Sequence, residues 1–185
     1  MESQRLFVAL ELPDGVRDDL RSAVEPRRAD LPGVRWVPPE NWHVTLVFLG
    51  ATSADRVSGV GARLQDALAG VVAFDTVLTT FGGFPSQARA RVLWAGLEDR
   101  AGRIGELART VREALGAEPQ DRPFAAHVTV ARSATPLRLP EGFTAAAVPS
   151  TPFTVKELIL FRSHLARPAP RYEPLAGFPF GEGVT

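Results

Sequence analysis

The chain has 185 residues, of which 45% are hydrophobic and 23% charged, a composition typical of a globular protein with one domain or two closely packed halves. Its 21 basic side chains balance 21 acidic ones, so we expect any phosphate recognition in a local pocket rather than along a basic stripe that coats duplex nucleic acid. The sequence has no cysteine, which excludes disulfides, thiolate nucleophiles and cysteine zinc sites.

Targeting and membrane segments are not expected. The longest apolar runs are far shorter than the roughly 20 residues that a membrane helix needs. The first residues carry Glu2, Arg5 and Glu11 among the apolar ones, which does not fit a signal peptide. We therefore expect a cytoplasmic protein, and a monomer.

Hydrophobic periodicity predicts alternating strands and helices in the first half. Taken in order, the expected elements are a strand at 5–12, a helix at 14–28, a short strand at 34–37, a strand at 42–49 closed by Gly50, a helix from Ser53 to about Leu68, and strands at 73–81 and 91–97 separated by a turn region at Gly82, Gly83 and Pro85.

The second half repeats this rhythm. A helix at 100–115 leads through a proline-containing loop to a strand at 126–131, followed by a short helix near 141–147 and strands at 153–161 and 171–175. This order predicts the α+β class, with strands outnumbering helices. No low-complexity linker divides the chain, so we expect residues 1–185 to form one domain whose two halves share a core.

One short motif occurs twice. The sequence contains three histidines, and two of them begin the same tripeptide, His43-Val-Thr45 and His127-Val-Thr129. The two copies lie about half the chain length apart, and each falls in an expected strand. The repeated motif indicates an internal duplication.

Strand geometry predicts how the motif is presented. Because side chains alternate between the faces of a strand, His43 and Thr45 share one face, roughly 6–7 Å apart. Val47 is expected on that same face, and Val44 and Phe48 on the opposite one. An imidazole and a hydroxyl on an otherwise apolar face cost desolvation energy unless something satisfies them. A cleft between two related halves, lined by both copies, would satisfy them with water and then substrate.

Two facing imidazoles suit displacement at phosphorus. Near neutral pH one ring can accept a proton from the attacking oxygen while the other donates one to the leaving oxygen. The hydroxyls of Thr45 and Thr129 can donate to non-bridging phosphate oxygens, and Arg132 can add a charged contact. No metal is required.

Other interpretations of these residues are open. A single histidine in a strand is commonly structural, and two histidines without nearby carboxylates or cysteines make a poor metal-ligand set. His164 lacks a following threonine and is expected to be structural or at the rim of the site. Arg132, taken alone, could be an ordinary surface arginine. The three tryptophans are expected in the core.

The sequence resembles the two-histidine phosphoesterase superfamily, whose motif is His-x-Thr-x once per lobe. Within it, the sequence is most similar to the bacterial and archaeal RNA 2',3'-cyclic phosphodiesterases, also known as 2'-5' RNA ligases. The matching stretches are RLFVAL at 5–10, ENWHVTLVFLG at 40–50, RVLWAGL at 91–97, RPFAAHVTVAR at 122–132 and LFRSHL at 160–165.

The resemblance implies a bilobal α+β fold, with two pseudo-symmetric antiparallel sheets and outer helices around a central cleft. It implies hydrolysis of RNA 2',3'-cyclic phosphate ends to 2'-phosphates without metal or cofactor, and the reverse, ATP-independent 2'-5' joining. His127 corresponds to the proton acceptor and His43 to the proton donor. Thr45, Thr129 and Arg132 correspond to the substrate-binding residues.

Two alternatives remain open at this stage. The substrate could be a small cyclic phosphate rather than an RNA end, since the neutral charge does not favour long RNA. The chain could also be a nucleotide- or RNA-binding module without turnover, although both histidines and both threonines are present.

Overall fold

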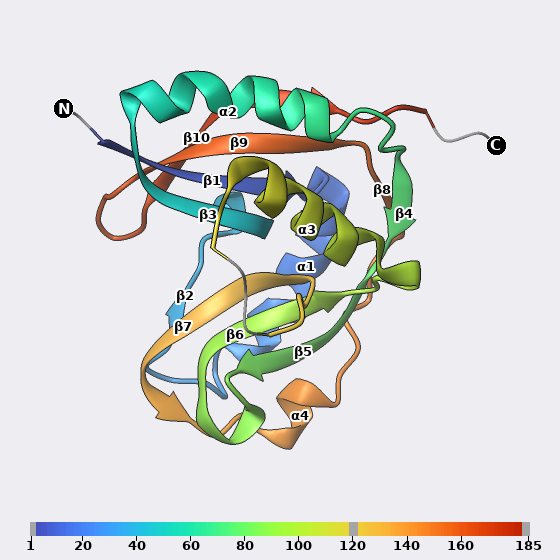
Figure 1. Cartoon of the computed structure of the whole chain (residues 1–185). Coiled ribbons are helices and arrows are strands. Elements are labelled where there is room, and N and C mark those ends of the chain that lie inside the picture. Colours follow the sequence, from blue (N-terminus) through green and yellow to red (C-terminus); the bar gives the residue numbers. More distant parts are fainter. Residues whose placement is uncertain (1–2, 119–121, 183–185) are drawn as a thin grey trace.

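Strands and helices alternate along the computed structural model, which describes residues 3–118 and 122–182 (Figure 1). The strands are β1 (Ser3–Glu11), β2 (Arg35–Trp36), β3 (His43–Ser53), β4 (Phe74–Thr76), β5 (Leu78–Phe84), β6 (Ala90–Leu97), β7 (His127–Leu137), β8 (Phe153–Val155), β9 (Glu157–His164) and β10 (Arg171–Pro179). The α-helices are α1 (Asp14–Val24), α2 (Ala54–Ala67), α3 (Arg103–Leu115) and the short α4 (Glu141–Thr144). No helix in the described ranges is both long enough and apolar enough to cross a membrane.

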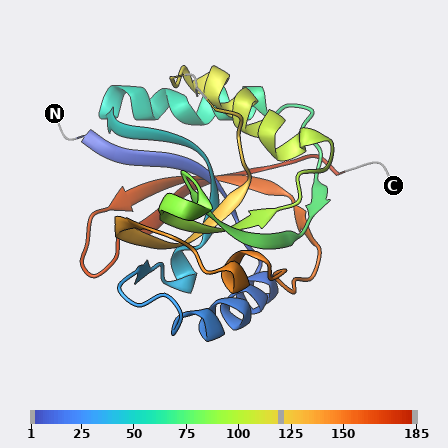
Figure 2. The ribbon, with the colours of Figure 1, turned by 90° about the horizontal axis from the view of Figure 1, so that it is seen from below.

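The main sheet consists of two antiparallel halves. Its strand order is β10-β9-β1-β3-β7-β6-β5, with β2 added beside β7. The halves meet between β3 and β7 through one register pair, Val44 with Val128. Figure 2 shows α2 and α3 together on one side of the strands and α1 on the opposite side. The expected α+β class with two antiparallel, helix-flanked sheets is thus confirmed, and the two sheets are continuous through that pair.

A strand–helix–strand unit occurs once in each half. The first consists of β1, α1 and β3, and the second of β6, α3 and β7. In both units the two strands pair antiparallel, with Glu11 opposite His43 in the first and Gly96 opposite His127 in the second. The duplication indicated by the repeated tripeptide is therefore present in the strand register as well.

The strand β1 connects two apolar clusters. Leu6, Val8 and Leu10 belong to a large core that both halves share, whereas Phe7 and Ala9 belong to a smaller cluster on the other face. Because both faces are covered, β1 is a continuous apolar run instead of an alternating one. The smaller cluster includes residues of β9, and Tyr172 of β10 packs against it.

Two glycine predictions were wrong. Gly50 does not end its strand, because β3 continues to Ser53 and pairs with β1 along its whole length. Gly82 and Gly83 lie inside β5 and not in the expected turn. A Cβ atom at Gly82 would lie 2.3 Å from the ring of Trp94, so this glycine makes room for an indole across the sheet.

Two expected strands are each divided in the structure. Residues 73–81 are divided between β4 and β5, and residues 153–161 between β8 and β9. β4 and β8 leave the main sheet and pair with each other in a separate two-stranded sheet. The strands themselves were predicted correctly, but their division depends on partners distant in the sequence.

Candidate active site

The two copies of the tripeptide meet where the halves of the sheet join. His43 and His127 are the first residues of β3 and β7, and each precedes a valine of the joining pair. A small cavity of about 50 Å³ lies at this junction. Its walls consist of Val37, Asn41, His43, Thr45, Phe48, His127, Thr129, Arg132 and Tyr172. The five side chains expected to form the site are therefore brought together.

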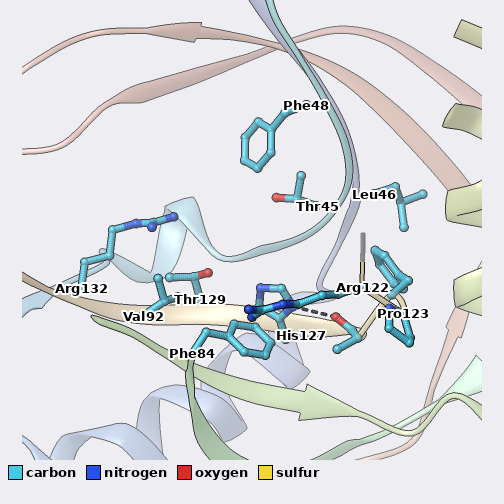
Figure 3. Close-up of a pocket in the computed structure, with 12 residues that line it drawn as sticks. Thr45, Leu46, Phe48, Phe84, Val92, Arg122, Pro123, His127, Thr129 and Arg132 are labelled. Carbon is cyan, nitrogen blue, oxygen red and sulfur yellow. Dashed lines mark hydrogen bonds between the residues drawn. The ribbon is translucent and has the colours of Figure 1, made fainter. Parts of the chain in front are cut away.

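A larger cavity of about 520 Å³ adjoins the small one and shares with it the walls formed by Phe48, His127 and Arg132. Figure 3 shows Thr45 and Phe48 on one wall, facing His127, Thr129 and Arg132 on the other. Arg122 reaches into this cavity from the segment that precedes β7. The site is thus a cleft with a small inner compartment and a wide outer one.

A β-bulge follows the threonine in β3. On β1, Ala9 pairs with Thr45 and Val8 pairs with Val47, so Leu46 has no partner in the register. Such an extra residue interrupts the simple alternation of side chains. Leu46 and Val47 are accordingly both buried, although they are adjacent in the strand.

The same bulge occurs in β7. The register against β6 passes from Thr129 to Ala131 and leaves out Val130. Val130 and Ala131 are both buried, and Arg132 is the next exposed residue. The second copy of the motif therefore repeats the backbone irregularity of the first.

The bulge corrects the expected direction of Phe48. We expected this side chain on the face opposite to His43 and Thr45, but it lines both cavities together with Thr45. Phe48 is 68% exposed, the other large exposed apolar side chains being Leu165 and Leu175 among the described residues. Simple alternation fails at Phe48 because the extra residue Leu46 shifts the side chains directly after it to the other face.

Backbone carbonyls orient both imidazoles in the same way. His43 Nδ1 lies 2.7 Å from the Asn41 carbonyl oxygen, and His127 Nδ1 lies 2.7 Å from the Ala125 carbonyl oxygen. Because a carbonyl can only accept, Nδ1 is the donor in each ring. Nε2 is then the nitrogen of each ring that remains for proton transfer.

Both histidines are shifted towards the neutral form. The pKa of His43 is lowered from 6.5 to about 4, mainly by burial, with smaller contributions from the charges of His127 and Arg132. Burial also lowers the pKa of His127, with Arg132 again contributing, while the backbone hydrogen bonds oppose the shift at both rings. A positive charge on His127 therefore opposes protonation of His43.

His164 lies apart from this pair, near the end of the β9–β10 hairpin. Its Nε2 is 2.6 Å from a carboxylate oxygen of Glu173, in a partly exposed pair. The histidine hydrogen bond lowers the pKa of Glu173. His164 does not line either cavity of the cleft.

The described part of the chain contains no evident set of metal ligands. Within residues 3–118 and 122–182, no group of three or more histidine, cysteine, aspartate or glutamate residues is placed to hold a metal ion. The two cleft histidines already use Nδ1 for backbone hydrogen bonds.

Several residues of the cleft were not expected from the sequence, among them Phe48, Asn41 and Tyr172. Phe48 could have been found by aligning the two copies, because it stands at the same distance after His43 as Arg132 does after His127. Asn41 and Tyr172 had no such signal. They reach His43 through a carbonyl contact and through the C-terminal hairpin, respectively.

Comparison with known proteins identifies the family. The family model of the LigT-like phosphoesterases, which describes the sequences of that family, matches residues 10–94 and 96–172 of this chain. The chain belongs to this LigT-like phosphoesterase family. The resemblance expected from the paired motifs is thereby confirmed at the family level.

Curated relatives within this group carry a common name. The RNA 2',3'-cyclic phosphodiesterase of Escherichia coli K12 is 31% identical over 182 residues, covering 94% of this chain and 95% of that protein. The RNA 2',3'-cyclic phosphodiesterase of Geobacillus stearothermophilus is 33% identical over 189 residues, which cover 97% of this chain. The aligned region spans only 58% of the Geobacillus protein.

Solved LigT structures have the same fold. The E. coli LigT structure without ligand matches with a TM-score of 0.79 and 27% identity over 98% of this chain and 100% of that one. The E. coli LigT complex with 3'-AMP matches with a TM-score of 0.80 and 28% identity over the same shares of the two chains. These comparisons place this LigT-like chain among the phosphoesterases.

Proposed function

We propose that this protein hydrolyses the 2',3'-cyclic phosphate ends of RNA to 2'-phosphates, using His43 and His127 and no metal ion. The main support is the pairing of two imidazoles, one from each half of the sheet, on one small cavity with a threonine beside each. The curated relatives named RNA 2',3'-cyclic phosphodiesterase support the substrate class.

The proposed reaction is an in-line displacement at phosphorus. His127 Nε2 accepts a proton from a water molecule as the water oxygen attacks the phosphorus. The bond between phosphorus and O3' breaks, and His43 Nε2 donates a proton to the departing O3'. The product has a 2'-phosphate and a 3'-hydroxyl, and the two histidines have exchanged protonation states.

Three further side chains would hold the phosphate. The hydroxyls of Thr45 and Thr129 donate to non-bridging oxygens from the two walls of the cleft. Arg132 supplies a positive charge from the same wall as Thr129 (Figure 3). Donors that are already in place stabilise the charge that develops at phosphorus without reorganisation.

The protonation states impose one requirement on this mechanism. In the free protein a pKa of about 4 keeps His43 neutral near neutral pH, whereas the proton donor in the proposed reaction is protonated His43. A bound phosphate anion favours the charged form of a neighbouring imidazole. Substrate binding must therefore raise the pKa of His43 from about 4 before this ring can donate.

The outer cavity suits the nucleoside that carries the phosphate. Phe48 presents an exposed ring on its wall, and a nucleobase can stack on such a ring whatever its identity. The balanced net charge of the chain fits this local recognition better than an extended track along RNA.

The same site could join RNA ends. If the 5'-hydroxyl of a second RNA replaces the attacking water, the same proton transfers give a 2'-5' linkage without ATP. Because both halves contribute to one cleft, we propose that residues 1–185 act as a single bilobal domain. We further propose that the protein acts as a monomer in the cytoplasm.

The decisive experiment is a metal-free incubation with two substrates. One is a short oligonucleotide ending in a 2',3'-cyclic phosphate, and the other is a nucleoside 2',3'-cyclic monophosphate. The position of the product phosphate is then identified for the wild type, His43→Ala and His127→Ala. His164→Ala is the matched control, because it removes the third histidine, which lies outside the cleft.

We expect a 2'-phosphate product and a loss of about 10²–10⁴-fold in each cleft variant, the usual effect of removing one acid or base. His164→Ala should retain turnover. Activity within threefold of the wild type in either cleft variant would remove that histidine from the mechanism. Tight binding without turnover of either substrate would indicate a binding module, and turnover of the monomer alone would indicate a small-molecule enzyme.

A further inference from the structure

Tyr172 enters the catalytic cleft from the C-terminal hairpin. It is the second residue of β10 and pairs with Ser163 of β9, at the far edge of the half-sheet that contains His43. Its half-buried side chain lines the small inner cavity that holds both histidines. The proposed mechanism assigns this residue no role.

The ring of Tyr172 packs edge-on against the imidazole of the proposed proton donor. The two ring centroids are 5.2 Å apart at an interplanar angle of 89°. Phe7 lies 5.0 Å from the same imidazole and 4.9 Å from Tyr172. His43 therefore sits against two aromatic rings that also contact each other.

The second histidine has a corresponding neighbour without a hydroxyl. Phe84 at the end of β5 contacts His127 edge-on, with centroids 4.9 Å apart at an angle of 84°. Phenylalanine thus provides this ring contact on one side of the cleft. The packing itself requires no phenolic oxygen, so the hydroxyl of Tyr172 calls for a separate explanation.

The position of the hairpin relative to His43 is held by Asn41. The buried Asn41 side chain donates from Nδ2 to the Pro170 carbonyl oxygen at 2.8 Å. The carbonyl of the same residue accepts the hydrogen bond from His43 Nδ1. One residue thereby connects the orientation of the imidazole to the chain segment immediately before Tyr172.

The surroundings of the Tyr172 hydroxyl favour an anion as its partner. Among the described residues, this hydroxyl makes no hydrogen bond to a protein group, and the inner cavity lined by Tyr172 is also lined by Arg132 and both threonines. Burial raises the pKa of Tyr172, so the oxygen keeps its proton at neutral pH, although the charge of Arg132 acts against this shift. A protonated phenol beside a guanidinium is a hydrogen-bond donor that fits a phosphate oxygen.

We propose that Tyr172 is a further substrate-contacting residue, whose hydroxyl donates to a non-bridging oxygen of the phosphate held between His43 and His127. The C-terminal hairpin thereby supplies one donor to the phosphate site. This inference rests on the proposed function for its substrate, but it requires only that the inner cavity binds phosphate.

The test is Tyr172→Phe, which removes one oxygen and keeps the ring. The measurements are kcat and KM for a nucleoside 2',3'-cyclic monophosphate, the affinity for inorganic phosphate by calorimetry, and the melting temperature. Ser163→Ala is the matched control, since it removes a hydroxyl from the cross-strand partner, which does not line the cavity.

Tyr172→Phe should weaken phosphate binding and lower kcat/KM by about 10- to 100-fold, the range for one hydrogen bond to a charged group. Its melting temperature should stay near that of the wild type, and Ser163→Ala should change neither quantity by more than about twofold. Wild-type phosphate affinity and wild-type kcat/KM in Tyr172→Phe would overturn the proposal and leave the residue a packing role.

A second variant separates the ring from the hydroxyl. Tyr172→Leu removes both, so the His43 pKa measured by NMR should rise from about 4 towards 6.5 as the imidazole becomes less buried, whereas Tyr172→Phe should leave this pKa low. Equal phosphate affinity in Tyr172→Phe and wild type would contradict the hydroxyl contact even if Tyr172→Leu were impaired. Because phosphate binding does not depend on turnover, this test stands even if the proposed hydrolysis fails.

Discussion

Phe48 and Arg132 occupy equivalent positions in the two copies of the motif. Each is the fifth residue after its histidine, each follows a β-bulge, and each is exposed where it lines the cleft. The duplicated backbone therefore presents an aromatic ring from one half and a guanidinium from the other. A ring suits a nucleobase and a guanidinium suits a phosphate, so the cleft has two chemically different walls.

This difference predicts that substitutions on the two walls weaken the binding of different ligands. Phe48→Ala should raise KM for a nucleoside 2',3'-cyclic monophosphate by about 5- to 150-fold, since stacking on an aromatic side chain is worth roughly 1–3 kcal/mol per base. Arg132→Ala should instead weaken inhibition by inorganic phosphate. Steady-state kinetics with phosphate as the competing ligand measures both effects.

Phe48→Trp is the control for the first variant, because it keeps an aromatic face on the same wall. It should retain a KM close to that of the wild type. If Phe48→Ala weakened the binding of inorganic phosphate as strongly as the binding of the nucleotide, Phe48 would be part of the phosphate site and would not act as a stacking platform for the base.

The two histidines predict an acidic pH optimum for kcat/KM. One ring must be protonated and the other neutral, and in the free protein the pKa of His43 is about 4 and that of His127 is below 6.5. Because both pKa values lie below 6.5, the singly protonated form is confined to a window at acidic pH. Above this window kcat/KM should fall about tenfold per pH unit, and below it the neutral base is lost.

The pH profile of kcat should lie further to the alkaline side. Bound phosphate raises both imidazole pKa values, so the singly protonated form persists to higher pH in the complex. Initial rates from pH 4 to 9, at low and at saturating substrate, separate the two profiles. A kcat/KM that stayed constant from pH 6.5 to 8.5 would contradict an essential protonated imidazole in the free protein.

Metal removal should leave the reaction unchanged. Both imidazoles use Nδ1 for backbone carbonyls, and in the described ranges no third ligand joins them to form a metal site. The rate is measured before and after dialysis against EDTA. Inhibition by EDTA that is reversed by added Zn²⁺ or Mn²⁺ would show that the reaction requires a metal ion.

The fold should depend on the absence of a side chain at Gly82. Gly82→Ala forces a Cβ to within 2.3 Å of the Trp94 ring, and overpacking of this kind costs about 1–3 kcal/mol. Urea unfolding should therefore show a lower midpoint. Gly61→Ala in α2 is the control, because a Cβ there meets no atom within 4 Å and alanine favours a helix by roughly 0.5–1 kcal/mol. Equal stability of Gly82→Ala and the wild type would mean that the indole can move aside.

Local pattern was sufficient for the order of elements and for the central pair of the site. The hydrophobic periodicity of each amphipathic helix and apolar strand is visible within about ten residues, so it predicts the element without knowledge of distant partners. The repeated His-x-Thr placed His43 and His127 on equivalent strands, and the strand register agrees with that duplication. The prediction of a turn at Gly82 was wrong because the glycine is explained by Trp94, which lies on the neighbouring strand of the sheet.

The sequence by itself determined the α+β class, the duplication and the side chains that meet at the junction of the halves. Only the tertiary structure decided that Phe48 turns into the cleft and that Tyr172 reaches His43 from the C-terminal hairpin. The physical reason is the same for both residues. A bulge is defined by the register against a partner strand, and a contact between β3 and β10 forms only after distant segments pair. Neither relationship exists in the local sequence, because both arise from the non-local pairing of strands.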